Sequence, residues 1–366
     1  MKLFYESTSD IFKNENALSL EYIPPEMPGR EAQLKELASI LNSVTRGRRA
    51  RNILITGPPG TGKTSCVKYV LNQLSEFSKS AIPVYINCWN YSTTLSIISE
   101  IGERLNLGLP RRGISFDEIF ERIKETLIKN NKILIVVLDE VDRLIANNST
   151  EILYYLSRGD ELAAQRISVI AITNDKELPS KLEERIRSSL LEVRMTFEKY
   201  TAYELKKILN ERAKLAFFSH AISDEIVALA AANAAKNGGD ARIGISLLYQ
   251  AGLNAERDNS NKILIKHVRL AIKEVLEETD YIARHFDSLS EPEKRIINLL
   301  LTGSLTTGEI NQKLSDLGIS QRMIQIYLNK LEESGMIESQ EIEVKPKGRT
   351  TLFSIKKKPM NNYNKD

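Results

Sequence analysis

The segment that most constrains the fold is a glycine-rich loop between an apolar run and a helix-like run. The apolar residues 53–55 suit a buried strand, and the residues after 64 suit a helix. The loop consists of Gly57, Pro58, Pro59, Gly60, Thr61, Gly62, Lys63 and Thr64. Its glycines adopt backbone angles that side chains forbid, so successive N–H groups can converge on phosphate oxygens. Strand, loop and helix in this order predict a phosphate-binding P-loop, and hence a nucleoside triphosphate ligand.

Two side chains at the end of this loop are expected to contact the phosphates and a metal ion. Lys63 supplies a positive charge at the β- and γ-phosphates, and Thr64 supplies a hydroxyl for Mg²⁺. The helix that begins near Lys63 points its positive end at the same anion. An ordinary glycine-rich turn is the alternative, but both flanking elements that the motif requires are present.

A second apolar run, residues 133–138, ends in Asp139 and Glu140. A continuous apolar run of this kind is typical of a strand buried on both faces of a parallel sheet. The carboxyl ends of such strands border the ligand crevice. Asp139 therefore suits the Mg²⁺ shell, and Glu140 suits a general base that polarises the attacking water. Solvated acids at a strand end are the alternative, which the P-loop disfavours.

A third apolar run, residues 167–173, ends at Asn174, whose amide is suited to orient the lytic water. An Asn-Asp pair is more common in turns, but the strand-then-polar pattern repeats here. The alternation of strands and helices from 53 to 195 predicts a doubly wound parallel sheet. Before it, the proline-stiffened residues 22–29 lead to Arg30. That segment either lies against a purine ring or is a plain connector.

An arginine cluster precedes the first strand, and it consists of Arg46, Arg48, Arg49 and Arg51. We interpret it as a solvated face rather than a phosphate-facing patch. The net charge of the chain is only +3, so bulk charge does not by itself indicate a nucleic-acid partner.

Residues 196–280 change to a purely helical pattern. Thr201 and Glu204 form a capping box, and further helices are predicted at about 224–236, 243–257 and 265–277. Arg242 follows a Gly-Gly-Asp-Ala run at the start of one of these helices, so it can project towards a neighbouring site. A surface arginine at a helix start is the alternative.

Residues 285–358 show three capped helices followed by two strand-like runs, which together predict a winged helix-turn-helix. In its third helix the core stripe is Ile324, Leu328 and Leu331. Arg322, Gln325 and Asn329 share the opposite face and are side-chain types that read base edges. Lys345, Lys347 and Arg349 on the wing suit phosphates or a minor groove. A winged helix that binds protein is the alternative.

The domain boundaries that follow are 1–195 with a leader over 1–21, 196–280, 285–358, and a tail over 359–366. A chain of 366 residues suits two or three domains.

Cys66 and Cys88 are the only cysteines, too few for a disulfide framework, so a reduced intracellular compartment is expected. Neither a secretion signal nor a membrane-spanning run is recognisable. We therefore expect a cytoplasmic, nucleoid-associated protein without a membrane partner.

Taken together, these residues resemble the AAA+ ATPases, and within them the archaeal origin-recognition (Orc/Cdc-type) replication initiators. The resemblance runs from about Tyr22 to Ile355. It implies an α/β AAA+ P-loop parallel sheet with a helical lid, plus a C-terminal winged helix domain. By the same resemblance, residues 57–64 extended by Ser65 are Walker A, and Asp139-Glu140 are Walker B. Asn174 resembles sensor 1, Arg242 resembles sensor 2, and the segment around Arg30 resembles the one that borders the adenine.

The resemblance also has implications for ligands and partners. Residues 89–118, with Arg111 and Arg112, resemble the insertion through which such initiators contact DNA. ATP or ADP with Mg²⁺ is the implied ligand, and double-stranded origin DNA is the implied partner. Other initiator paralogues and the replicative helicase are the further partners. A clamp-loader-like or other regulatory AAA+ ATPase, whose winged helix binds protein, is the alternative.

One position departs from the clamp-loader pattern. Ser189 stands where those relatives carry an arginine that acts on a neighbouring subunit, although Arg185 or Arg187 is available as a substitute. An arginine finger contributes about 10³–10⁵ in rate, so its absence predicts a slow ATPase that acts as a switch.

Overall fold

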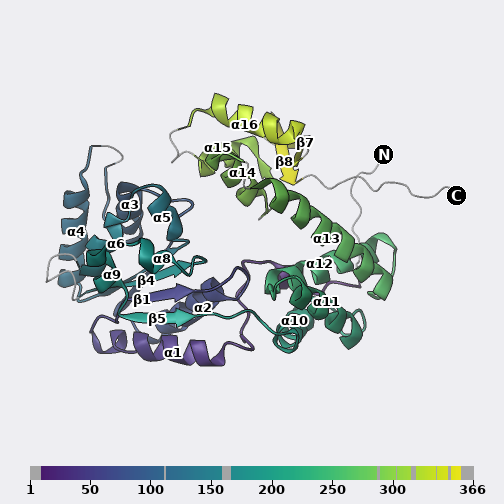
Figure 1. Cartoon of the computed structure of the whole chain (residues 1–366), viewed down its shortest axis with the longest axis horizontal. Coiled ribbons are helices and arrows are strands. Elements are labelled where there is room, and N and C mark those ends of the chain that lie inside the picture. Colours follow the sequence, from purple (N-terminus) through teal and green to yellow (C-terminus); the bar gives the residue numbers. More distant parts are fainter. Residues whose placement is uncertain are drawn as a thin grey trace. The chain divides into compact units, whose positions relative to one another are not determined.

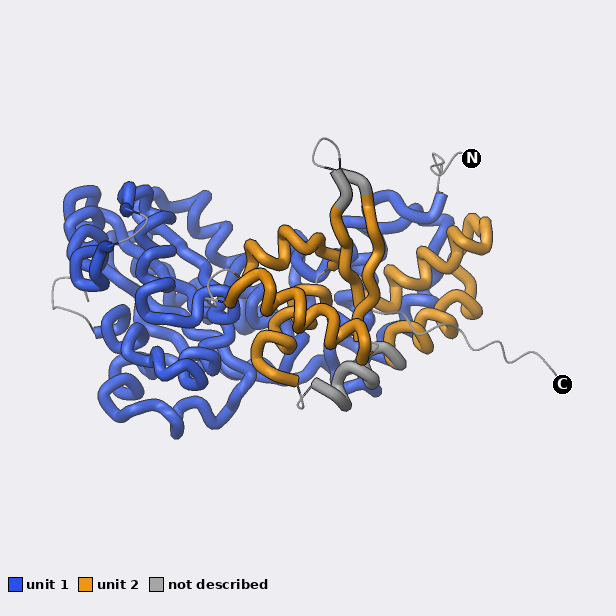
Figure 2. The backbone as a smooth tube through the Cα atoms, turned by 90° about the horizontal axis from the view of Figure 1, so that it is seen from above, with its two compact units in different colours: residues 1–245 blue, residues 246–366 orange. Residues whose placement is uncertain are grey.

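The chain forms two compact units, residues 1–245 and 246–366, which Figure 2 shows in different colours. The computed structural model describes residues 10–110, 113–158, 166–286, 289–301, 303–314, 319–334, 336–344 and 348–355. Among these residues, none of the helices is both long and apolar enough to cross a membrane. Each unit is described by itself below.

The first unit is built on a five-stranded parallel sheet with the order β2-β3-β4-β1-β5. Its strands are β1 (Ile53–Thr56), β2 (Ala81–Asn87), β3 (Ile133–Asp139), β4 (Ile167–Thr173) and β5 (Val193–Thr196). Every residue of β3 and β4 is buried, as expected for central strands covered on both faces. The predicted doubly wound parallel sheet is thereby confirmed.

Helices cover both faces of this sheet (Figure 1). On one face lie α1 (Glu31–Leu41) and α2 (Lys63–Phe77), which share a core with Ile53 and Ile55. On the other face Leu54 shares a core with apolar side chains of α3, α4, α6 and α9. The helices on this side are α3 (Thr94–Arg104), α4 (Phe116–Lys129), α5 (Asp142–Ala146), α6 (Glu151–Arg158), α8 (Leu178–Lys181) and α9 (Glu184–Leu190).

Helices α10 (Ala202–Ala216), α11 (Asp224–Lys236) and the start of α12 (Ala241–Arg257) complete the first unit. The predicted capping box begins α10: the Thr201 hydroxyl accepts from the backbone N–H of Glu204, and the Glu204 carboxylate accepts from the backbone N–H of Thr201. The boundary between the units falls inside α12, where a continuous helix gives the sequence no linker signal.

Residues 11–22 pack against α10. Phe12 stacks on Phe217 with ring centroids 5.1 Å apart. The Arg212 guanidinium donates to the carbonyl of Ala17, at the end of the short helix η1 (Glu15–Leu18), over 2.8 Å, and to that of Tyr22 over 2.7 Å. Residues 11–22 are therefore a docked segment rather than a loose leader.

The second unit holds the rest of α12, α13 (Ile265–Phe286) and a smaller three-stranded antiparallel sheet with the order β6-β8-β7. The other elements are α14 (Glu291–Leu301), β6 (Leu305–Thr306), α15 (Thr307–Lys313), α16 (Gln321–Glu333), β7 (Ile337–Val344) and β8 (Gly348–Ile355). Helices α14, α15 and α16 share a core with the sheet that includes Ile296, Ile310 and Phe353. This is the predicted winged helix arrangement.

Helix α13 differs from the sequence expectation. It continues to Phe286 instead of ending near residue 277. Residues 278–286 contain neither glycine nor proline, so no residue type in this stretch interrupts a helix.

Candidate nucleotide site and DNA-reading helix

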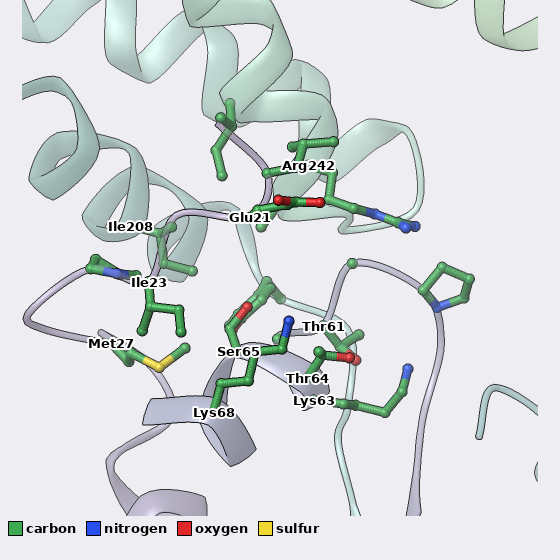
Figure 3. A pocket seen from close by; sticks show the side chains of 18 of the residues that line it. Glu21, Ile23, Met27, Thr61, Lys63, Thr64, Ser65, Lys68, Ile208 and Arg242 are labelled. Atoms are coloured by element: carbon green, nitrogen blue, oxygen red, sulfur yellow. The ribbon is translucent and has the colours of Figure 1, made fainter. Parts of the chain in front are cut away.

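A pocket of about 330 Å³ lies at the carboxyl ends of the strands of the first unit. It is lined by the P-loop, by the ends of β2, β3 and β4, by residues 20–28, by α10 and by the start of α12. Apolar side chains of Ile23, Met27 and Ile208 gather at one end, whereas Lys63, Thr64 and Arg242 lie towards the other (Figure 3). An apolar end and a polar end suit a nucleotide, whose base is flat and whose phosphates are charged.

Lys63 is held at the polar end of this pocket. Its side chain is buried, and Nζ donates to the carbonyl oxygens of Gly57 (2.6 Å) and Pro58 (2.7 Å) and to Oδ1 of Asn174 (2.7 Å). Burial lowers the pKa of Lys63 to about 8, although the nearby carboxylate of Asp139 opposes this shift. The structure therefore brings together the P-loop lysine and the predicted sensor 1 amide.

The P-loop backbone needs glycine at Gly60. Its φ is +68°, and a Cβ there would lie 1.7 Å from Oδ1 of Asp240. The backbone N–H of Ala241 also donates to the Gly60 carbonyl over 3.2 Å. The loop thus touches the beginning of α12 directly, with no room for a side chain between them.

Asp139 accepts hydroxyl protons from two neighbours. Its Oδ2 accepts from Thr64 Oγ1 at 2.6 Å and from the phenol of Tyr85 at 2.8 Å, and its Oδ1 accepts from the backbone N–H of Glu140 at 3.0 Å. The predicted Walker A threonine and Walker B aspartate are therefore adjacent. The sequence analysis missed Tyr85, whose only signal is a polar group two residues before the end of a predicted strand.

Glu140 has a backbone conformation that is rare for its type. Its φ is +59°, in the left-handed region, where strain in a non-glycine residue is a frequent property of functional sites. Burial raises the pKa of Glu140 to about 7, and the charges of Asp139 and Asp142 add to the shift. A carboxyl group with a pKa near neutrality is well matched to general-base chemistry.

Arg242 lies at the start of α12 and lines the pocket. Its Nη2 donates to Oδ2 of Asp240 at 2.7 Å and its Nε donates to Oδ1 at 3.1 Å, while half of its side chain remains exposed. The arginine therefore reaches the site from the helical region, as its place at a helix start predicts.

Arg30 has a different position from the one expected beside the base. Its side chain is buried, its Nε donates to the Thr61 carbonyl at 2.9 Å, and its Nη2 donates to the Glu198 carbonyl at 2.6 Å. The guanidinium also lies 3.8 Å from the ring centroid of Tyr200. It does not line the pocket and instead supports the P-loop from behind.

Neither arginine near position 189 lines the pocket. Arg185 pairs with Glu183 at 2.7 Å, and Arg187 is exposed on α9. Ser189 Oγ lies 2.8 Å from Ser157 Oγ, and the Ser189 carbonyl accepts from the side-chain amide of the buried Asn52 at 2.9 Å. The serine is therefore a packing residue between α6, α9 and β1.

Helix α16 carries the candidate base-reading side chains. Ile324, Leu328 and Leu331 are buried in the core, whereas Arg322, Gln325 and Asn329 are exposed. Gln325 Nε2 donates to Asn329 Oδ1 at 3.0 Å, so these two amides lie side by side. Among the other predicted DNA contacts, four lie outside the described residues: Arg111, Arg112, Lys345 and Lys347. Arg349 lies in β8, but its side chain is not among those described.

Comparison with known proteins places this arrangement in a family. Residues 26–170 match the AAA ATPase domain, and residues 206–273 match the Cdc6 AAA+ ATPase-type lid domain. The ORC1-type DNA replication protein 1 of Sulfurisphaera tokodaii is 36% identical over 364 residues, which cover 95% of this chain and 91% of that protein.

Solved structures agree with these sequence matches. The Aeropyrum pernix ORC1 protein, solved in complex with DNA, is 31% identical with a TM-score of 0.69, over 95% of this chain and 94% of that one. Cdc6p from Pyrobaculum aerophilum is 28% identical with a TM-score of 0.67, over 95% of each chain. The chain therefore belongs to the ORC1-type DNA replication proteins, within the AAA+ ATPases.

Proposed function

We propose that this chain is an ATP-regulated replication initiator that binds duplex origin DNA and helps to recruit the replicative helicase. The observation that supports it most is the presence of a nucleotide pocket and a winged helix with an exposed polar reading face on one chain. The relative from Aeropyrum pernix, solved with DNA, supports the DNA part of the proposal. Other initiator paralogues are the expected partners on the same DNA.

The nucleotide is ATP or ADP, oriented by the two ends of the pocket. Ile23, Met27 and Ile208 pack against the base, and the P-loop backbone with Lys63 binds the phosphates. Once a phosphate oxygen is present, Lys63 can exchange its bond to Asn174 for one to that oxygen, which frees the amide to orient a water molecule.

The oxygen atoms around Thr64 fit a magnesium ion that arrives with the nucleotide. Thr64 Oγ1 and Asp139 Oδ2 are 2.6 Å apart, and hard oxygen donors of this kind bind Mg²⁺ together with substrate phosphates and water. When bound, the ion supplies positive charge against the β- and γ-phosphates. Thr64 and Asp139 are the residues that would hold it.

Hydrolysis in this proposal is slow and serves as a switch. Glu140 accepts the proton of the attacking water, Asn174 orients that water, and Arg242 contributes charge from α12. Ser189 stands where clamp-loader relatives carry an arginine that acts on a neighbouring subunit, and neither Arg185 nor Arg187 lines the pocket of its own chain, so in a single chain they supply no charge to the phosphates. Nucleotide state would then control the position of the helical region that carries Arg242.

DNA recognition is assigned to the exposed face of α16 and to the insertion at residues 89–118. Arg322, Gln325 and Asn329 suit base edges in a major groove, where amide side chains bind adenine and arginine binds guanine. Base contacts of this type give sequence preference, whereas phosphate contacts give affinity without preference.

The test is duplex binding by the full chain at physiological salt. Duplexes enriched from a random library should bind at least 10³-fold more tightly than random duplex, in the range typical of specific proteins. Gln325→Ala/Asn329→Ala should remove about 1–3 kcal/mol of this preference for each good bidentate contact. The matched control is Asn72→Ala/Gln73→Ala, which removes the same two side-chain types from the exposed surface of α2. Equal binding to enriched and random duplexes would rule out a sequence-specific initiator.

A further inference from the structure

The amino-terminal edge of the large sheet carries a hollow that the nucleotide site does not use. Its lining is Gly47, Arg48, Arg49 and Arg166, and its volume is about 300 Å³. Residues 47–49 precede β1 and Arg166 precedes β4, and these two strands pair directly in parallel. The sheet therefore brings together arginines that are more than a hundred residues apart in sequence, at the edge opposite the P-loop.

Two of these arginines are held in place. Arg49 Nη1 and Nη2 donate to the two carboxylate oxygens of Glu192 at 3.2 and 2.7 Å. Arg166 Nη1 donates to Asn131 Oδ1 at 3.0 Å and to the Lys132 carbonyl at 3.4 Å. Both side chains are partly buried, so their positions are set by the fold before any ligand binds.

The third arginine is available. The Arg48 side chain is exposed, and it makes no hydrogen bond or ion pair with the described part of the chain. A guanidinium has five N–H donors in a rigid fork that matches phosphate oxygens bidentately. Arg48 and the unused N–H groups of Arg166 therefore supply donors on the walls of one hollow.

Charge at this edge is unbalanced. Among the described residues, Glu192 is the carboxylate that pairs with the hollow, and it already accepts from Arg49 and from the backbone N–H of Asn52. Arg46 and Arg51, on either side of the same segment, are exposed as well. Neighbouring like charges repel one another, and an anion bound between them offsets that repulsion.

We propose that this arginine hollow binds a backbone phosphate of duplex DNA, as a contact separate from the winged helix and the 89–118 insertion. The inference rests on the proposed DNA-binding function. Duplex DNA carries one negative charge per about 1.7 Å of its axis, so one duplex can satisfy the hollow and the flanking cations together. The arginine cluster at residues 46–51, which we interpreted from the sequence as a solvated face, is in this proposal a phosphate-facing patch, because the fold places Arg166 beside it.

The test compares salt dependence of duplex binding by the full chain for wild type and Arg48→Ala/Arg166→Ala. Each lost phosphate contact should reduce the slope of log K against log salt concentration by about 0.9. We expect the double variant to lose one to two phosphate contacts, and its affinity for duplex DNA at low salt to fall by about 3- to 30-fold. The affinity for enriched and for random duplexes should fall by the same factor, because phosphates carry no sequence information.

The matched control is Arg122→Ala/Lys214→Ala, which removes two exposed cations of the same unit that lie outside the 89–118 insertion and pair with Glu118 and Glu211. Its slope should equal that of wild type. Unchanged nucleotide binding by the hollow variant shows that it is folded. If the double variant does not bind nucleotide, the same measurement is made on Arg48→Gln alone, since the Arg48 side chain has no partner among the described residues.

An unchanged slope in the hollow variant, or a loss confined to enriched duplexes, would overturn the inference. An acidic protein partner at the hollow would produce the first of these results. A wild-type chain without any duplex affinity would instead contradict the proposed function itself.

Discussion

Asp139 is the residue on which the polar end of the nucleotide site depends. Hydroxyls of Thr64 and Tyr85 both donate to its Oδ2, so its orientation is fixed from two sides. Thr64 lies at the start of α2, where its hydroxyl is suited to a metal ion, whereas Tyr85 lies in β2. We infer that Tyr85 is a positioning residue that holds the carboxylate for Mg²⁺.

Tyr85→Phe keeps the ring and removes the donor. We expect ATP hydrolysis to fall by about 3- to 10-fold, because a hydrogen bond to a charged group contributes about 1.5–3 kcal/mol and only part of it affects orientation. The difference in hydrolysis rate between the variant and wild type should become smaller as the Mg²⁺ concentration rises. If the Tyr85 hydroxyl only stabilised the fold, Mg²⁺ would not change this difference. Tyr203→Phe, at an exposed position on α10, is the control and should match wild type. A defect that Mg²⁺ does not change would contradict this assignment.

The pKa values of Glu140 and Lys63 set a narrow pH range for activity. Burial raises the pKa of Glu140 to about 7, so below this pH the base is protonated and kcat/KM should fall by up to tenfold per pH unit. Burial lowers the pKa of Lys63 to about 8, so above this pH the lysine loses the charge that attracts phosphate. We expect kcat/KM for ATP to be highest between these two values.

The acid limb of this profile should disappear in Glu140→Gln, whose residual rate should be nearly independent of pH below 7. The alkaline limb should remain, because Lys63 is unchanged. A steady-state ATPase assay over pH 5.5–9.5 measures both limbs, and an acid limb that persists in Glu140→Gln would exclude Glu140 as the base.

Arg30 shows where prediction from single residues stops. The motif spacing predicted Lys63, Thr64, Asp139 and Glu140 as site residues, because the chemistry of phosphate and metal limits the residue types at these positions, and all four line the pocket. Arg30 follows a proline-rich segment that does line the pocket, but its own guanidinium turns towards backbone carbonyls behind the loop. A sequence pattern alone does not distinguish a residue that contacts the nucleotide from a residue that hydrogen-bonds to the backbone of the P-loop.

At the scale of elements, α16 presents an apolar side chain among its polar ones. Ile326 is 48% exposed, next in sequence to Gln325 and on the surface that carries the Gln325–Asn329 amide pair. In a major groove, amide side chains recognise adenine, and an apolar side chain contacts the thymine methyl group. The face of α16 therefore suits a step that contains A·T pairs.

Replacing thymine by uracil in an enriched duplex removes only that methyl group. At the contacted position we expect wild-type affinity to fall by about 3- to 5-fold, which corresponds to the roughly 0.8 kcal/mol of one buried methyl-sized group. Ile326→Ala should bind the two duplexes nearly equally. A fluorescence anisotropy titration of each duplex with each protein gives the double-mutant cycle, and equal sensitivity in both proteins would remove Ile326 from the base contacts.

The helices that could be predicted best were those with a capping residue at the start and apolar residues at helical spacing. The capping boxes of α10 and α15 and the Ser320 cap of α16 fixed where those helices begin. Helix ends were less predictable, as in α13, because the sequence there has no residue that forces a stop. The role of Ser189 was also hidden, since its contacts with Ser157 and Asn52 come from distant elements.

At the scale of the whole molecule, the candidate nucleotide pocket lies within the first unit. Every residue that lines the pocket lies between Leu20 and Ile245. The alternation of strands and helices predicted this sheet and its ligand edge, and the three capped helices with two strand-like runs of residues 285–358 predicted the winged helix. The unit boundary inside α12 was beyond prediction, because it depends on contacts rather than on composition.

Ligand binding to the folded state alone stabilises it by mass action. At an ATP concentration 100-fold above Kd, we expect the unfolding free energy to rise by about 2.7 kcal/mol, and the Tm of the first transition by about 5–10 °C. Lys63→Ala should lose this shift, whereas Lys35→Ala on the exposed surface of α1 should keep it. Differential scanning calorimetry with and without ATP measures it. A full ATP shift in Lys63→Ala would contradict the P-loop assignment.

The docking of residues 11–22 onto α10 has a practical consequence for anyone who shortens this chain. The match to the AAA ATPase domain begins at residue 26, so a truncation there looks harmless. It would delete Leu20 and Ile23 from the wall of the pocket and leave the Arg212 guanidinium facing no carbonyl partner from this segment. Such a protein would keep every Walker residue and still bind nucleotide poorly. A useful shortened version begins before Ile11.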